Sequence, residues 1–249
     1  MDTIERIARR NRLRAEEVIR DSRLAEIWRS VGAEVRQVGS LRSGLLMKHR
    51  DIDFHIYSSP LRLEESFTAM AQLAADPAVG RIECRNLLAT DEACVEWHAT
   101  YRDRDGDEWQ LDMIHIVRGS RYDGYFERVA DRIAAALTPV TRRAILQLKY
   151  DTPDDVKIAG IEYYVAVLRD GVRTYDAFAE WRRTHPLTGI VEWMCPDRPI
   201  QSQTGAGPPV PVCTRYPVVL SSGGLTAKRN AKKSRRRKRN RFYLVIPHF

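Results

Sequence analysis

Cysteines and long hydrophobic runs are both scarce in this 249-residue sequence. The four cysteines show neither CxxC spacing nor histidines placed as zinc ligands, which argues against structural zinc and against a disulfide framework. No apolar stretch approaches the roughly 20 residues that cross a bilayer. Residues 1–20 are rich in Arg and Glu and lack the apolar segment of a signal peptide. We therefore expect a cytoplasmic protein without a membrane span.

Acidic residues are almost absent from the last part of the chain. Residues 195–249 contain 12 Lys and Arg but one acid, Asp197, so residues 1–194 carry a net charge of −3 although the whole chain carries +8. Prolines are frequent in this tail, and 10 of the 14 residues of 228–241 are basic. The composition predicts a largely disordered tail. If the protein binds nucleic acid, we expect this tail alone to do so. The same composition also fits an incidental extension of the chain.

The order of apolar patterns predicts a mixed α/β region followed by helices only. Helical spacing over 4–31, with a break near 21–22, is followed by strand patterns at 35–38 and 52–57, a short helix at 41–47 and a helix at 60–75. Three more strand patterns follow at 81–87, 94–101 and 109–117, the last two joined as a hairpin across 103–107. Helical patterns then cover 122–137, 139–150, 156–169 and 175–184. We expect domains at 1–119 and 120–194.

Two carboxylates share one face of a predicted strand. Side chains alternate across a strand, so Asp51 and Asp53 point the same way, whereas Ile52 and Phe54 enter the opposite layer. Like charges at this spacing repel unless a proton or a cation neutralises them, and a hard divalent ion with oxygen ligands does so. A bare Asp-x-Asp is also compatible with two solvated aspartates at the beginning of a strand.

Two neighbouring features favour the metal. The pair Gly39-Ser40 ends the preceding strand with a residue that permits close approach and a hydroxyl donor, as a phosphate cradle requires. Asp112 lies on another strand, in WQLDMIHI, with no obvious cationic partner. If that strand lies beside the one that carries Asp51 and Asp53, three carboxylates converge and can hold two Mg²⁺ ions.

This ordered set resembles the nucleotidyltransferase superfamily related to DNA polymerase β. The signature of that superfamily is Gly-Ser, a short helical spacer, Asp-x-Asp and a third Asp on a later strand, and it is matched here over residues 31–117. The resemblance implies a nucleotidyltransferase-type mixed sheet followed by a helical bundle. It also implies that Gly39 and Ser40 hold the phosphates of a nucleoside triphosphate, and that Asp51, Asp53 and Asp112 bind Mg²⁺. Leu41-Arg42-Ser43-Gly44 departs from the Ala-Arg-Gly that many minimal members carry after Gly-Ser.

One lysine has two interpretations. Lys149 lies late in a predicted helix of the second half, where superfamily lysines reach the β- or γ-phosphate. A lysine at a helix end also interacts favourably with the helix dipole, so both roles stay open. His49, His98 and His115 are interpreted as structural or surface residues.

These observations predict an enzyme that transfers a nucleoside monophosphate from an NTP to an unidentified hydroxyl-bearing acceptor, with release of pyrophosphate. The alternative is a non-catalytic or antitoxin-type nucleotide-binding partner, in which we expect at least one of the three carboxylates to be lost. A third interpretation, a nucleic-acid polymerase or tailing enzyme, depends on the basic tail alone. The charge of −3 before the tail favours a small acceptor and suits a cationic one.

Overall fold

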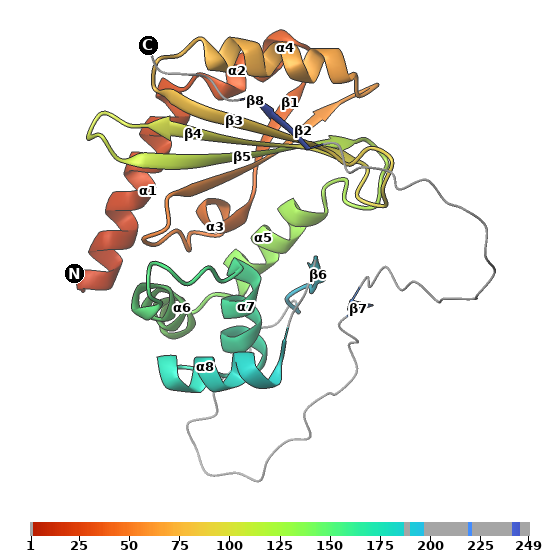
Figure 1. Ribbon diagram of the computed structural model, residues 1–249. Helices are drawn as coiled ribbons and strands as arrows, with labels where there is room; N and C mark the ends of the chain where they lie inside the picture. Colours follow the sequence, from red (N-terminus) through yellow and green to blue (C-terminus); the bar gives the residue numbers. More distant parts are fainter. Residues whose placement is uncertain (1, 187–189, 197–218, 221–240, 245–249) are drawn as a thin grey trace, which may run out of the picture.

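The computed structural model describes residues 2–186, 190–196, 219–220 and 241–244. Helices and strands are mixed up to residue 117, and helices dominate the described part after it (Figure 1). The elements of the first part are α1 (Thr3–Asp21), α2 (Leu24–Ser30), β1 (Glu34–Gln37), α3 (Gly39–Arg42), β2 (Asp51–Ser58), α4 (Leu63–Ala74), β3 (Val79–Asn86), β4 (Cys94–Arg102) and β5 (Glu108–Val117). Those of the second part are α5 (Tyr125–Ala136), α6 (Pro139–Asp151), α7 (Gly160–Tyr164), the π-helix η1 (Val165–Arg169), α8 (Tyr175–Thr184), β6 (Val191–Glu192), β7 (Val219–Leu220) and β8 (Arg241–Leu244).

The main sheet has the strand order β1-β2-β5-β4-β3-β8. The central pair β2 and β5 is parallel, and every other neighbouring pair is antiparallel. A mixed sheet followed by helices is the expected fold class, which is thereby confirmed. The hairpin of β4 and β5 across residues 103–107 is also as expected.

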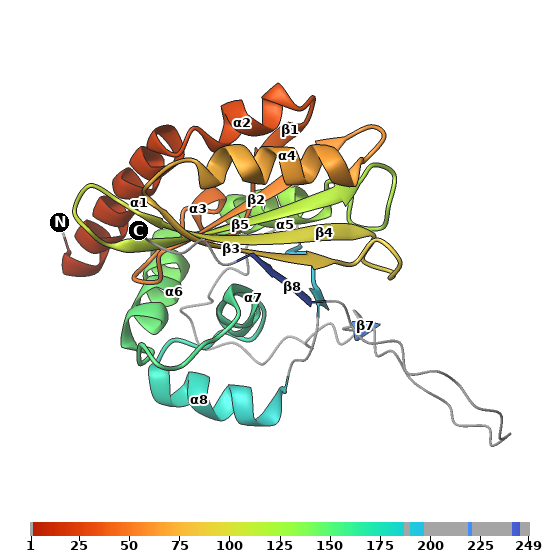
Figure 2. The same cartoon turned by 45° about the horizontal axis from the view of Figure 1, so that its top comes forward.

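One face of the sheet is covered by α2 and α4, as the turned view in Figure 2 shows. Ile52 and Phe54 of β2 enter this layer, where Trp28 of α2 and Leu73 of α4 are buried with them. Trp97 of β4 is buried in the same layer. These residues form the core because the even-numbered side chains of β2 all point away from the aspartates.

The opposite face of the sheet looks toward α3, α5 and the later helices (Figure 1). The helices α5 to α8 enclose a second hydrophobic cluster that includes Ile145, Tyr163 and Phe178. Ile4 of α1 and Leu45, from before residue 119, belong to this cluster as well. Residues from before and after position 119 therefore contribute to this one core, and the domain boundary at residue 119 stays a prediction.

Two expected helix boundaries are wrong. The helix predicted over 41–47 is the single turn α3, because Gly44 takes up a positive φ of 75° and the N–H of Leu45 bonds back to the Ser40 carbonyl. The helix predicted over 156–169 begins only at Gly160 and continues as a π-helix from Val165.

Most of the predicted disordered tail, 195–249, lies outside the described residues. Its described segments include β7, which pairs with β6, and β8, which pairs with β3. None of the helices in the described part of the chain combines the length and the apolar character that a membrane crossing requires.

Candidate active site

Three carboxylates meet on the sheet face that looks toward the later helices. Asp51 and Asp53 come from β2, and the parallel register places Asp53 directly beside Asp112 of β5. The condition for their convergence, that the two strands lie side by side, is thus met. A cavity of about 810 Å³ opens over them, and its lining includes all six residues that the sequence singled out: Gly39, Ser40, Asp51, Asp53, Asp112 and Lys149.

The Gly39-Ser40 turn touches one of these carboxylates. Gly39 has a φ of 67°, and a Cβ at this position would lie 1.9 Å from Oδ2 of Asp53, so the turn requires glycine. The backbone N–H of Ser40 donates a hydrogen bond to the Asp53 carboxylate. The predicted phosphate cradle therefore lies at the cavity wall against Asp53.

The surroundings of Asp53 disfavour the negative charge of its carboxylate. Burial raises the pKa of Asp53 to about 7, with further increases from the charges of Asp51 and Asp112 and opposing effects from Lys149 and the Ser40 N–H. A buried carboxylate that lies beside two others suits a divalent cation, which supplies positive charge and accepts oxygen ligands. The donor set therefore fits Mg²⁺.

Lys149 is buried between the carboxylates and the helices. Its ammonium donates to the carbonyl of Leu45, at 3.1 Å, and to the hydroxyl of Tyr164, at 3.2 Å. Burial opposes its charge, but Tyr164 and Asp51 outweigh that effect, so the pKa of Lys149 is raised. The side chain therefore stays cationic at the cavity wall, where an anionic ligand can reach it.

Asp112 has a partner that the sequence analysis did not identify. Nδ1 of His98 lies 2.5 Å from Oδ1 of Asp112, and the Gln110 amide donates to both oxygens, at 2.8 and 3.1 Å. The hydrogen bond to Asp112 raises the pKa of His98. The expectation of no cationic partner was wrong, because His98 lies opposite Asp112 across the β4–β5 hairpin rather than near it along the chain.

The register of the β4–β5 hairpin predicts the contact of His98 with Asp112. A turn centred on Asp105 pairs Asp103 with Asp107, and the same register carried back along both strands pairs His98 with Asp112. The interpretation of His115 as structural agrees with its position: the ring is fully buried, and its nitrogens lie 2.8 Å from Ser58 Oγ and 3.2 Å from Ser66 Oγ.

No protein-family model matches the sequence, and no curated protein matches it. Solved structures do match. A structure of the Cid1 poly(U) polymerase with MgGTP is 17% identical, with a TM-score of 0.46, over 64% of this chain and 50% of that chain. A structure of the non-canonical poly(A) polymerase complex GLD-2–GLD-3 is 12% identical, with a TM-score of 0.41, over 68% of this chain and 58% of that chain.

The chain thus spans about half the length of the structures that it matches. At these values the likeness assigns no activity to this chain.

Proposed function

We propose that this protein is a Mg²⁺-dependent nucleotidyltransferase, which transfers a nucleoside monophosphate from an NTP to a hydroxyl-bearing acceptor and releases pyrophosphate. The observation that supports it most directly is the convergence of Asp51, Asp53 and Asp112 on two neighbouring parallel strands under one cavity. A structural role would not require Asp53 at a place where burial and the charges of Asp51 and Asp112 oppose its own charge.

Each residue has a role in this proposal. Asp51, Asp53 and Asp112 hold Mg²⁺, which when bound neutralises phosphate charge and lowers the pKa of the acceptor hydroxyl. Gly39 lets the backbone approach the outer phosphates closely, and Ser40 donates hydrogen bonds to them. Lys149 adds a buried positive charge to the same end of the cavity.

Asp112 orients the acceptor. Its carboxylate is held by His98 and Gln110, so the side chain keeps one orientation toward the cavity. In the reaction the acceptor oxygen forms a bond to the α-phosphorus while the bond to the pyrophosphate oxygen breaks, and the hydroxyl proton passes to Asp112 or to water. The acceptor gains one nucleotide and pyrophosphate leaves.

The test uses parallel incubations with α-labelled and γ-labelled NTPs, Mg²⁺ and a cell extract. We expect label from the α-phosphate on the acceptor and label from the γ-phosphate in pyrophosphate. Asp51→Asn and Asp112→Asn should each abolish this labelling, whereas Asp155→Asn, at an exposed position, should retain it. Label from the γ-phosphate on the acceptor would contradict the proposal, and so would full labelling by the Asp112 variant.

The non-catalytic alternative predicts NTP binding without turnover in the same assay. We further propose that the protein acts in the cytoplasm, and that residues 1–119 and 120–194 are its catalytic and helical domains.

A further inference from the structure

One arginine at the cavity has a buried donor without a partner. Nε of Arg50 is buried and makes no hydrogen bond with the described part of the chain. Within that part, the Arg50 guanidinium makes a single hydrogen bond, from Nη2 to Oδ2 of Asp107 at 2.8 Å. A guanidinium carries five N–H donors in one plane, so most of those of Arg50 are unused. A buried donor without a partner costs free energy unless a ligand supplies an acceptor.

The backbone and the side chain of Arg50 are both held in place. Its carbonyl accepts a hydrogen bond from the N–H of Gln110, at 2.7 Å. Its partner Asp107 is also bonded to Arg14, whose Nη1 lies 2.7 Å from the same carboxylate oxygen. The Arg14 side chain is only 13% exposed and binds Asp103 of the same hairpin turn as well. The guanidinium of Arg50 is therefore ordered before any ligand arrives, which lowers the entropic cost of binding.

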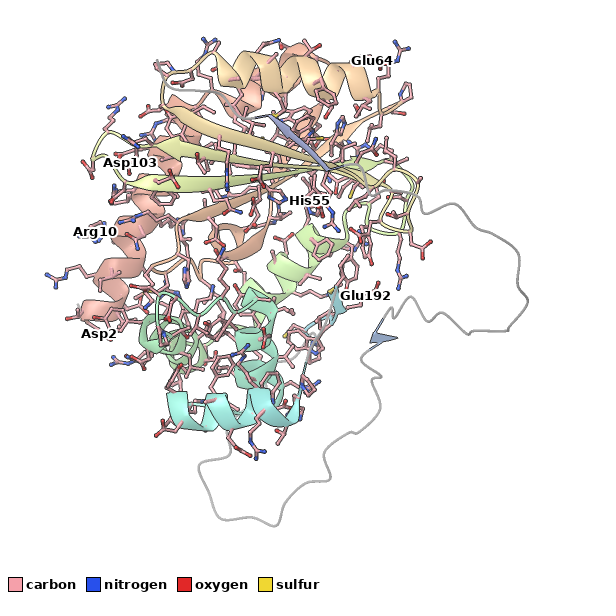
Figure 3. The ribbon with its side chains drawn as sticks, in the orientation of Figure 1. Asp2, Arg10, His55, Glu64, Asp103 and Glu192 are labelled. Carbon is pink, nitrogen blue, oxygen red and sulfur yellow. The ribbon has the colours of Figure 1, made fainter. Side chains whose placement is uncertain are left out.

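Arg50 is the member of this network that faces the cavity. Among the described residues, those that line the cavity over the carboxylates include Arg50 but neither Asp107 nor Arg14. The Arg50 side chain is 35% exposed, so a ligand in the cavity can reach it. Figure 3 labels Asp103 at the hairpin turn and His55 farther along the sheet, and the contact with Asp107 places Arg50 at the end of the sheet near Asp103.

Arg50 and the Gly39-Ser40 turn lie on opposite sides of Asp51. The turn contacts Asp53, whereas Arg50 directly precedes Asp51 and lies about 10 Å from Asp53 along an extended chain. In an in-line displacement the attacking oxygen and the leaving oxygen lie on opposite sides of the phosphorus. With the leaving pyrophosphate at the Gly39-Ser40 turn, Arg50 lies on the side from which the acceptor attacks.

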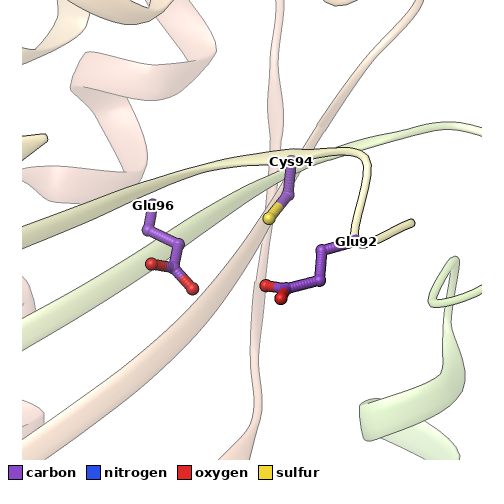
Figure 4. Close-up of side chains that lie close together, drawn as sticks. All are labelled: Glu92, Cys94 and Glu96. Carbon is purple, nitrogen blue, oxygen red and sulfur yellow. The ribbon is translucent and has the colours of Figure 1, made fainter. Parts of the chain in front are cut away.

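Two further observations favour an anionic group of the acceptor at Arg50. Gln110, whose N–H binds the Arg50 carbonyl, also holds Asp112, the residue that orients the acceptor in the proposed function. Figure 4 shows the opposite end of the cavity, where carboxylate oxygens of Glu92 and Glu96 lie within 4.8 Å of each other. These carboxylates repel an anion, so a negatively charged group of the acceptor is favoured at the end with Arg50.

We propose that Arg50 binds a phosphate group of the acceptor, so that the acceptor is a phosphorylated alcohol. Several donors of Arg50 are free, and a phosphate offers more oxygens to them than a carboxylate does. The inference rests on the proposed function, because that function defines the side from which the acceptor attacks. The net charge of −3 over residues 1–194 suits a cationic acceptor instead, but this sum averages over the whole segment, whereas Arg50 is a donor at the site itself.

The test measures binding to the full-length protein by ligand-observed NMR. Mg²⁺ and an α,β-methylene NTP analogue, which fills the nucleotide site but cannot transfer its nucleotide, are present. The probes are a mixture of sugar phosphates, the same sugars without phosphate, a short oligoadenylate and adenosine. We expect signals from phosphorylated probes only, and the probe that gives them distinguishes a small phosphorylated molecule from the end of an oligonucleotide.

Variants of Arg50 assign the phosphate contact. In Arg50→Gln the affinity for phosphorylated probes should fall about ten-fold or more, since a charged hydrogen-bonded contact is lost. Asp107 keeps Arg14 as a partner in this variant, so we expect it to fold, and Arg50→Lys, which lacks the planar donors, serves if it does not. Arg183→Gln removes an arginine that is likewise paired with an acid, and this matched control should bind as the wild type does.

Binding of the NTP analogue, recorded on the same samples, separates the inference from the proposed function. We expect the same analogue affinity in Arg50→Gln and in the wild type. If the wild type does not bind the analogue, the result counts against the proposed function, and the comparison of phosphorylated with unphosphorylated probes in both proteins still decides the inference. Equal binding of the two kinds of probe, unchanged probe affinity in the Arg50 variant, or a loss of analogue binding in its place would overturn the inference.

Discussion

Replacing Asp53 by Asn should stabilise the metal-free protein at neutral and alkaline pH. In the native state Asp53 binds a proton up to a pH of about 7, whereas an aspartate in the unfolded chain releases it near 3.8. Between these values the native state binds more protons than the unfolded state, so the stability of the wild type falls as the pH rises from about 4 to about 7. The Asn variant lacks this loss.

The size of the effect follows from the same shift. A difference of about 3 pKa units corresponds to about 4 kcal/mol as an upper limit. We expect Asp53→Asn to be more stable than the wild type by about 2 to 4 kcal/mol at pH 8, and by close to zero near pH 4. Asn keeps an oxygen for the Ser40 N–H, so this hydrogen bond survives the substitution.

The assay is urea unfolding followed by tryptophan fluorescence, in EDTA, at several values between pH 4 and pH 8. The difference between variant and wild type isolates Asp53, because other titrating groups are common to both, and Asp155→Asn controls for loss of an exposed charge. Added Mg²⁺ should stabilise the wild type and have little effect on Asp53→Asn. A variant that is less stable than the wild type at pH 8, or a difference that does not change with pH, would refute the reasoning.

Three further substitutions test the surroundings of the carboxylates. Gly39→Ala should lower the free energy of unfolding by about 1 to 2 kcal/mol, because it strains a positive φ, and it should weaken Mg²⁺ binding in calorimetry, because its methyl group would displace Asp53. His98→Gln should lower kcat more than it raises the KM for NTP. In EDTA the variant should be less stable than the wild type below pH 6.5, and this difference should disappear as the pH rises through the raised pKa of His98; melting curves at several pH values measure it. Lys149→Met should weaken binding of a fluorescent NTP analogue about ten-fold or more through loss of a charged contact; an unchanged affinity would leave Lys149 with a structural role only.

The sequence was sufficient for Asp51 and Asp53, because alternation along β2 places both on one face. The β4–β5 hairpin brings Asp112 into the sheet, but its position beside Asp53 depends on the pairing of β2 with β5, which no local rule predicts. To predict the contact of His98 with Asp112, the register of the hairpin must be extended along β4 from Asp103, at the turn, to His98, five residues earlier.

Other features could not be found from local patterns. The burial of Lys149 depends on Leu45 and Tyr164, which reach it from distant segments of the chain. The contacts of His55 with Tyr57 and Glu127 likewise depend on α5, which comes from a later part of the chain and packs over the sheet. Composition cannot reveal such contacts, because they depend on which loops and helices pack over the sheet.

Helix α1 limits how the cavity can open. Its N-terminal residues Ile4 and Ala8 belong to the hydrophobic cluster of the helices, whereas Ala15 and Val18 belong to that of the sheet. A helix of 19 residues is a rod about 28 Å long, and this one is anchored in both cores. The cavity lies between these two cores, and α1 connects them as a continuous helix rather than as a flexible linker. A motion that separated the two cores would have to bend α1 or turn about its axis, and a glycine pair in the middle of this helix should make such a motion easier.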